Sequence, residues 1–406
     1  MLPLTFTGIF MRNQIPKEEL FEHAKISTTI DAVARLPGTE SWLNATISKV
    51  PIKIFDINGE LLFYDFPILS AAKEGGIQGY VTVGSRKEIG SPVISYELGP
   101  RRWNFYQAVE KLKRQFKKEF PKHKVTDIKL VCYSFPKLGV MFQAINPRGA
   151  ASRHIFDGAS LAPVPERKEK TEIEGFFAWS YLDSLTHQMK RSRLRQYYQV
   201  NKKLQEIPEI ERIAILEAEV IKQYLISDYV AAIVKFGTTK LLQYCTHYNY
   251  SEARSHHCFV LQGQEKNDYC AVATCQMILC YYRYYYTQDQ IAPKLSYSSG
   301  SGCPPDQSAG YEQLTCNHLD ATFDSSPTFS EAKSQIDALH PFKSGIPGHA
   351  RACAGYYCNL LTGVNRLYIY DPSPWNTNYK LAGSIKWEDW NAVTHTNYVF
   401  TKLTCP

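Results

Sequence analysis

The chain has 406 residues, of which 44% are hydrophobic and 21% charged, and its formal net charge is +7. This length is enough for two or three domains with full apolar cores. No apolar run approaches the length of a membrane-spanning helix, and a charge of +7 does not by itself indicate a nucleic-acid-binding protein. We therefore expect neither a membrane span nor a nucleic-acid partner.

The opening residues, MLPLTFTGIFMRNQ, are apolar but have no basic start and no small-residue cleavage site. They do not match a secretory signal peptide. The compartment stays open on this evidence. Secretion or display at the cell surface is expected if a leader has been removed, and a cytoplasmic location otherwise.

Residues 1–165 read as an α+β region without a catalytic constellation. The pair Asn58-Gly59 between alternating apolar residues predicts a β-hairpin. The other expected elements are helices over 17–35 and 105–120, short strands over 78–83 and 92–96, and a second hairpin over 125–145. We interpret this region as a pro-domain or a regulatory domain.

The segment Gly76–Val83, followed by Pro92–Tyr96, resembles the small pro-domains that precede some secreted cysteine peptidases of the streptopain kind. Short Gly-Tyr-Val strands also occur elsewhere. An unrelated binding or scaffold domain therefore remains the alternative.

Residues 166–250 are expected to form a helical connector. It begins in a proline-rich, charged linker over 163–171. Pro208 predicts the start of one long helix that ends near Gly237, with apolar residues on one side. A basic cluster precedes that helix and is interpreted as a solvated helix face, because no aromatic platform accompanies it; its residues are Lys190, Arg191, Arg193 and Arg195.

The stretch over 262–292 contains the strongest chemical signal. A polar, turn-prone segment leads to Tyr269-Cys270, and an apolar run of helical length follows at once. Asn267 or Asp268 is the expected N-cap, which places Cys270 in the first turn of a helix. Unpaired N–H groups at that position stabilise a thiolate. Gln264, six residues earlier, has an amide that can donate to an oxyanion.

Two later segments supply the partners that a cysteine nucleophile needs. His349 follows a Pro/Gly-rich turn and opens an apolar strand, and Asp371 closes the next strand before Pro372. An imidazole can hold the thiol proton, and a carboxylate can orient the imidazole. Asn365 is a competing orienting residue, but it precedes its strand, so Asp371 is preferred.

The order Gln…Cys…His…Asp resembles papain-like cysteine peptidases, and in particular the relatives of the bacteriocin leader-processing (C39-like) peptidases, over roughly residues 256–406. We expect a papain-like catalytic domain over 251–406. The resemblance implies a papain-like α+β fold with a catalytic helix and an antiparallel sheet. It implies that Cys270 is the nucleophile, that His349 is the acid and base, and that Asp371 orients His349. Gln264 would donate to the oxyanion together with the Cys270 backbone N–H. No cofactor or metal is implied.

Tyr269 and Trp375 flank these residues and are candidates for the lining of the substrate cleft. Residues 298–306 contain two glycines and a Pro-Pro pair and are expected to form a loop near the cleft. His256-His257-Cys258 lacks a second set of paired ligands at zinc-site spacing, so we expect no metal there.

Charge is distributed unevenly along the chain. Residues 255–406 carry ten Lys/Arg and twelve Asp/Glu, whereas the remainder carries 36 and 27. A basic N-terminal part against a slightly acidic catalytic part fits an intramolecular inhibitor. We therefore expect a latent precursor (a zymogen) that is released by cleavage within about 237–261 and then acts on a protein or peptide substrate.

Two other functions remain open. A thiol acyltransferase or transglutaminase-like enzyme uses Cys, His and Asp in the same order, and a catalytically inactive peptidase fold can serve as a binding protein. Ten of the eleven cysteines lie at or after Cys245. Disulfides among them are possible in an exported protein, and the pairing cannot be read from sequence; the residues considered are Cys303, Cys316, Cys353, Cys358 and Cys405.

Overall fold

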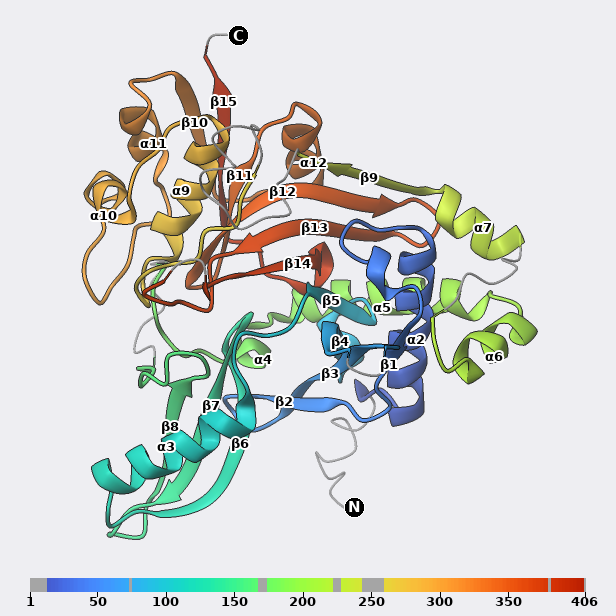
Figure 1. The fold of residues 1–406 in the computed structure, drawn as a ribbon, viewed down its shortest axis with the longest axis horizontal. Helices are drawn as coiled ribbons and strands as arrows, with labels where there is room; N and C mark the ends of the chain where they lie inside the picture. The colour runs from blue at the N-terminus through green and yellow to red at the C-terminus, as the bar shows by residue number, and fades with distance from the viewer. Residues whose placement is uncertain are drawn as a thin grey trace, which may run out of the picture.

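The computed structural model describes residues 13–72, 75–166, 174–221, 228–242, 259–378 and 381–404. Within these ranges the strands join into one sheet of fifteen strands, flanked by helices (Figure 1). Every strand pair is antiparallel except β2–β6, so the sheet is mixed. None of the helices in these ranges is long and apolar enough to cross a membrane.

The first part of the chain contains the elements that the sequence predicts, together with two strands that it does not, β1 and β8. The Asn58-Gly59 turn joins β2 to β3, and Gly59 adopts a positive φ of 93°. The elements are α2 (Lys17–Val33), β1 (Ala45–Ile47), β2 (Ile52–Asp56), β3 (Leu61–Ser70), β4 (Ile77–Gly84), β5 (Val93–Leu98), α3 (Phe105–Glu119), β6 (Lys124–Ser134), β7 (Lys137–Ile145) and β8 (Ala151–Asp157).

Strands β6, β7 and β8 form an arm with α3 packed on one face (Figure 1). The ring of Phe116 on α3 stacks on Phe142 of β7, with centroids 4.9 Å apart. The turn between β6 and β7 lies at the base of this arm, toward the C-terminal half of the chain. It places Lys137, the first residue of β7, in a buried position.

The C-terminal part contains the helix and strands expected of its sequence. Helix α9 is buried on all sides and packs against β11 and β12. The elements are α9 (Cys270–Tyr281), α10 (Gln288–Ile291), α11 (Ser308–Leu314), β10 (Leu319–Asp324), α12 (Phe329–Asp337), β11 (Phe342–Ile346), β12 (His349–Asn359), β13 (Val364–Asp371), β14 (Ser384–Asp389) and β15 (Asn397–Leu403).

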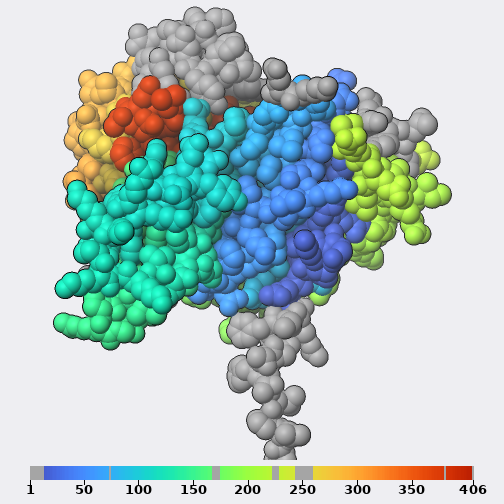
Figure 2. Space-filling view, turned by 60° about the horizontal axis from the view of Figure 1, so that its bottom comes forward, coloured from blue at the N-terminus to red at the C-terminus, as the bar shows by residue number. Residues whose placement is uncertain are grey.

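The two parts share the sheet, because β14 pairs with β5. Lys386 lies opposite Glu97 and Trp387 opposite Tyr96 in this antiparallel register. Trp387 is fully buried, and its indole N–H donates to the carbonyl of Pro37 at 2.8 Å. In the space-filling view the orange-red surface of the C-terminal strands lies directly against the teal surface of the arm (Figure 2).

The connector differs from its prediction. The prediction of one long helix from Pro208 to Gly237 is wrong, because helix α6 (Glu209–Glu217) has only nine residues. The backbone of Ile221 bonds instead to Asn44 and to Ala45, the first residue of β1, which a continuous helix would prevent. The remaining elements are α4 (Tyr181–Ser184), α5 (His187–Gln205), α7 (Asp228–Lys235) and β9 (Gly237–Leu241), and β9 pairs with β12.

The interpretation of the basic cluster as a solvated face is wrong for one of its residues. Arg193 is buried, and it donates to the Tyr181 hydroxyl at 2.6 Å and to the Thr394 hydroxyl at 3.2 Å. The guanidinium therefore joins the connector to the C-terminal part. Lys190, Arg191 and Arg195 are at least partly exposed, as expected.

Candidate active site

Cys270 is the first residue of α9 and is fully buried. The N-cap is Tyr269, with no side-chain capping bond, so the prediction of Asn267 or Asp268 is wrong. Asp268 instead accepts from the Tyr297 hydroxyl and from the Gly300 N–H, each at 2.9 Å. The Asp268 carboxylate therefore does not cap the helix, and it holds the loop over 298–306 beside the start of α9.

His349 opens β12 directly after a tight turn. Ile346 of β11 pairs with His349, so only Pro347 and Gly348 connect the two strands. Gly348 has a φ of +70°, a conformation that a residue with a side chain rarely adopts. Because α9 packs on β12, the N–H of Ala350 lies beside the Cys270 sulfur.

Asp371 contacts the histidine from the end of β13. His349 Nε2 and Asp371 Oδ1 are 2.7 Å apart, and both side chains are fully buried. The same carboxylate accepts from the Ser373 N–H at 2.9 Å and from Lys386 Nζ at 3.0 Å. Asn365 lies opposite Cys358, at the other end of the β12–β13 pair. The structure thus brings Asp371, and not Asn365, to His349.

The protonation states follow from these contacts. Burial alone would raise the pKa of Asp371, but Lys386 and His349 outweigh it and hold that pKa well below its usual range. An ionised carboxylate only accepts hydrogen bonds, so the proton of the neutral imidazole resides on Nε2. Nδ1 is buried and has no hydrogen-bond partner within the described ranges. It is left as the basic atom of the ring.

Both the thiol and the imidazole are held neutral. Burial raises the pKa of Cys270, and Glu174 adds to the rise, against the opposing effects of Lys137 and of the Ala350 and Ala271 N–H groups. Burial, together with Lys137, lowers the pKa of His349 to about 3. A thiolate–imidazolium pair is therefore disfavoured while the site is closed to water.

Gln264 lies beside the site, but its amide is occupied. Its Nε2 donates to the carbonyls of Lys266 and Asn267, each at 2.8 Å. The backbone of Gln264 pairs with Pro372 and Asn376, which connects the loop before Cys270 to the loop after Asp371. As an oxyanion donor, Gln264 would first have to give up one of these two bonds.

Tyr269 and Trp375, the two residues expected to line the substrate cleft, have different surroundings. The Tyr269 hydroxyl bonds to Lys266 and Asp289, and its ring meets Tyr297 edge-on at 4.8 Å. Trp375 is half-buried, and its indole N–H has no partner within the described ranges. Their roles in substrate binding stay predictions.

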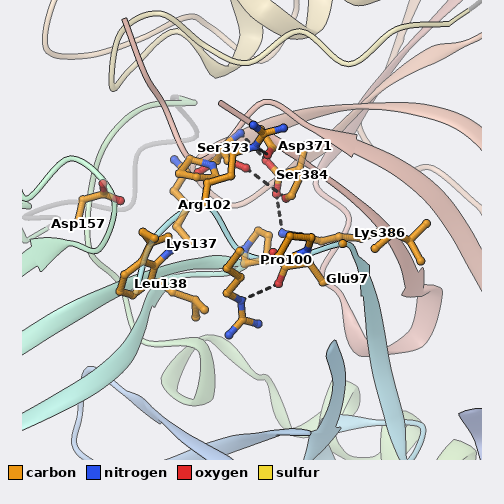
Figure 3. Close-up of a pocket in the computed structure, with 17 residues that line it drawn as sticks. Glu97, Pro100, Arg102, Lys137, Leu138, Asp157, Asp371, Ser373, Ser384 and Lys386 are labelled. Carbon is orange, nitrogen blue, oxygen red and sulfur yellow. Dashed lines mark hydrogen bonds and ion pairs between the residues drawn. The ribbon is translucent and has the colours of Figure 1, made fainter. Parts of the chain in front are cut away.

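A cavity of about 330 Å³ lies on the Asp371 side of the site, between the two parts of the chain. Figure 3 shows side chains from β5, β7 and the C-terminal strands facing this space, among them Glu97, Lys137 and Lys386. No sequence motif predicted the approach of β7. Lys137 is separated from Cys270 by more than a hundred residues, and nothing local marks it.

The cysteines in the described part of the chain form no disulfides. Four of the residues considered for disulfides, Cys303, Cys316, Cys353 and Cys358, are free thiols. Cys405 and the His256-His257-Cys258 segment lie outside the described residues, as does most of the stretch over 237–261 expected to be cleaved.

Comparison with known proteins supports the reading of the C-terminal part. Residues 257–398 match the model of the Peptidase_C39 like family. That part of the chain is therefore related to the C39-like, papain-like peptidases. No curated protein matches the chain. Among solved structures, that of UfSP from C. elegans matches at 14% identity and a TM-score of 0.28, covering 41% of this chain and 34% of that chain.

Proposed function

We propose, from the relation of residues 257–398 to the C39-like peptidases, that the chain is a cysteine peptidase made in a latent form. The observation that carries this proposal is the His349–Asp371 contact of 2.7 Å beside the first residue of a buried helix, Cys270. A papain-like arrangement of the catalytic part is included in the proposal. So is the division into an N-terminal regulatory region over 1–165, a connector and a catalytic part over 251–406.

In the proposed reaction the Cys270 thiol gives its proton to Nδ1 of His349, and the thiolate attacks a peptide carbonyl. The imidazolium protonates the leaving amine, and water then hydrolyses the thioester. Asp371, kept ionised by Lys386, holds the ring through Nε2. Its carboxylate stabilises the imidazolium that forms during the step.

Latency is supported by burial. Cys270, His349 and Asp371 are all inaccessible to solvent, and the pKa of His349 is lowered to about 3. Opening the site to water would lower the pKa of the thiol and raise that of the imidazole, because desolvation is the main cause of both shifts. Exposure of the site would therefore itself promote the active ion pair.

The test is hydrolysis of casein by the full chain and its variants. We expect Cys270→Ala and His349→Ala to abolish cleavage. Cys275→Ala is the matched control, because Cys275 lies on the same helix and is equally buried. Cleavage by the Cys270→Ala variant, or its loss in Cys275→Ala with the fold intact, would contradict the proposal.

A further inference from the structure

The segment that follows the linker lies against the candidate active site, with a bridge at Glu174 and bends at Gly175 and Phe176. Glu174 and Cys303 exchange two backbone hydrogen bonds, of 3.1 and 3.2 Å. The next N–H, that of Gly175, donates to the carbonyl of Gly348 at 3.2 Å. Gly348 directly precedes His349. Peptides bind proteins in this manner, by adding a strand to exposed backbone groups.

The carbonyl oxygen of Gly175 contacts Lys137, whose positive charge also affects Cys270 and His349. Lys137 Nζ donates to this oxygen at 3.1 Å, and Lys137 is buried. Lys137 also lowers the pKa values of Cys270 and His349, so its charge lies near both groups. A carbonyl that accepts a hydrogen bond from a buried ammonium group is polarised toward nucleophilic attack.

The close approach depends on two glycines. A Cβ on Gly175 would lie 2.4 Å from the carbonyl oxygen of Ser301, and a Cβ on Gly302 would lie 1.9 Å from that of Glu174. Both are backbone contacts that cannot yield by a rotamer change. The space between residues 174–175 and 301–302 is therefore narrow, and the position whose carbonyl faces Lys137 has room only for glycine.

The chain is held on both sides of the Gly175–Phe176 bond. Upstream, the Glu174 carboxylate pairs with Lys343 and accepts from Gln307 Nε2 at 2.8 Å, all three groups being buried. Downstream, the ring of Phe176 packs on Tyr133, and the backbone N–H of Trp179 donates to the Tyr133 carbonyl at 2.7 Å. The Gly175–Phe176 bond is thus held in a fixed position, and such positioning of a substrate is a main source of rate enhancement.

We propose that the chain's own segment Glu174–Phe176 is bound as a substrate, that Cys270 cuts the Gly175–Phe176 bond, and that Lys137 stabilises the oxyanion. This inference rests on the proposed function and moves the processing site away from 237–261. The sulfur of Cys270 bonds to the Gly175 carbonyl carbon, and the Phe176 nitrogen leaves with the proton that His349 took from the thiol. Departure of the new N-terminus at Phe176 admits water, which releases Gly175 as a carboxylate and restores the thiol.

The experiment follows the full-length protein by intact mass and N-terminal sequencing after purification. We expect wild type and Cys275→Ala to yield a fragment that begins Phe176-Phe177-Ala178, at a rate independent of protein concentration. Cys270→Ala and Gly175→Ala are expected to stay intact. Lys137→Met should slow the cut about 10²–10³-fold, as the loss of an oxyanion donor does, whereas Lys129→Met, a partly exposed lysine on β6, should not.

The outcomes separate this inference from the proposed function. A chain that stays whole, or that is cut elsewhere by Cys270, while Cys270 reacts with an epoxide-type thiol-peptidase inhibitor, would overturn the self-cleavage and leave the peptidase intact. No cut, no casein cleavage and no labelling of Cys270 in any folded variant would overturn both. If Gly175→Ala does not fold, the comparison of Lys137→Met with Lys129→Met decides alone.

Discussion

Glu174 and Lys343 form an ion pair with 2.6 Å between Oε1 and Nζ, and neither side chain is exposed. The Lys343 ammonium also donates to Asn397 Oδ1 at 2.6 Å and to the Pro305 carbonyl at 2.7 Å. The ammonium group therefore has one ion-pair partner and two hydrogen-bond acceptors, all within 2.7 Å. Glu174 comes just after the linker and Lys343 from β11, so this pair attaches the linker end to the catalytic sheet.

Breaking this pair should destabilise the chain strongly. In the uncut Cys270→Ala background, we expect Lys343→Met or Glu174→Gln to lower the free energy of unfolding by about 3–5 kcal/mol, because the remaining group stays buried without its counter-charge. Lys333→Met removes the exposed partner of Asp337 and should cost less than about 1 kcal/mol. Urea unfolding measures all three. Equal losses in the buried and exposed pairs would contradict the burial of Glu174.

Displacing the segment should open the site. We expect Gly302→Ala to raise the rate at which an epoxide inhibitor labels Cys270 at least about tenfold, which corresponds to about 1.4 kcal/mol, while slowing self-cleavage. Gly300→Ala is the matched control, because Gly300 also has a positive φ but no atom within 4 Å of its added Cβ. Equal rates in the two variants would show that the segment does not cover the thiol.

The orienting role of Asp371 can be separated from that of Asn365. We expect Asp371→Asn to lower kcat for casein about 10⁴-fold, as the corresponding substitution does in a Ser-His-Asp triad. Asn365→Ala should leave kcat within about twofold of wild type, since Asn365 lies at the far end of the strand pair. Steady-state kinetics on both variants checks this. The reverse order of effects would assign the role to Asn365.

Burial of a neutral His349 predicts a loss of stability in acid. Its pKa is about 3 in the folded chain and about 6.5 in an unfolded one. Between these values the unfolded chain binds a proton that the folded chain does not, so His349 lowers stability by about 1.4 kcal/mol per pH unit as the pH falls. In the Cys270→Ala background, His349→Gln should remove this part of the slope between pH 6 and 4.

The comparison of the chains with and without His349 isolates the contribution of this one side chain to the pH dependence of stability. Burial raises the pKa of Asp389 to about 6 and also raises that of Glu174, and both effects stabilise the folded chain as the pH falls. They are common to the two proteins and cancel in the difference. Identical slopes with and without His349 would mean that the imidazole is accessible to protons in the folded state.

Local signals in the sequence were sufficient for much of the fold. Asn58-Gly59 predicts its hairpin because few residue pairs adopt that turn, and the apolar run after Cys270 predicts a buried helix. His349 and Asp371 could be proposed because each stands at a strand end, marked by Gly348 and Pro372. Helix boundaries in the connector failed, because the backbone of Ile221 bonds to β1, a contact that no local pattern reveals.

The contacts that close the site could not be predicted from sequence. Lys137, Glu174 and Lys343 lie in three different parts of the chain, and each has an unremarkable neighbourhood. The pairing of β14 with β5, together with contacts such as that of Trp387 with Pro37, brings the first part of the chain against the catalytic part. The charge asymmetry predicted that the two parts attract, but not which residues meet. Glu174, which comes just after the linker, is the residue that reaches the site.

Labelling of the native full-length protein with an epoxide-type thiol-peptidase inhibitor, mapped by mass, shows whether Cys270 is an activated nucleophile. We expect Cys270 to be labelled slowly in the uncut Lys137→Met chain, rapidly in the processed protein, and not at all after Cys270→Ala. The exposed thiol of Cys316 serves as the internal reference. Label on Cys316 with none on Cys270, in both the uncut and the processed protein, would contradict an activated nucleophile at the start of α9.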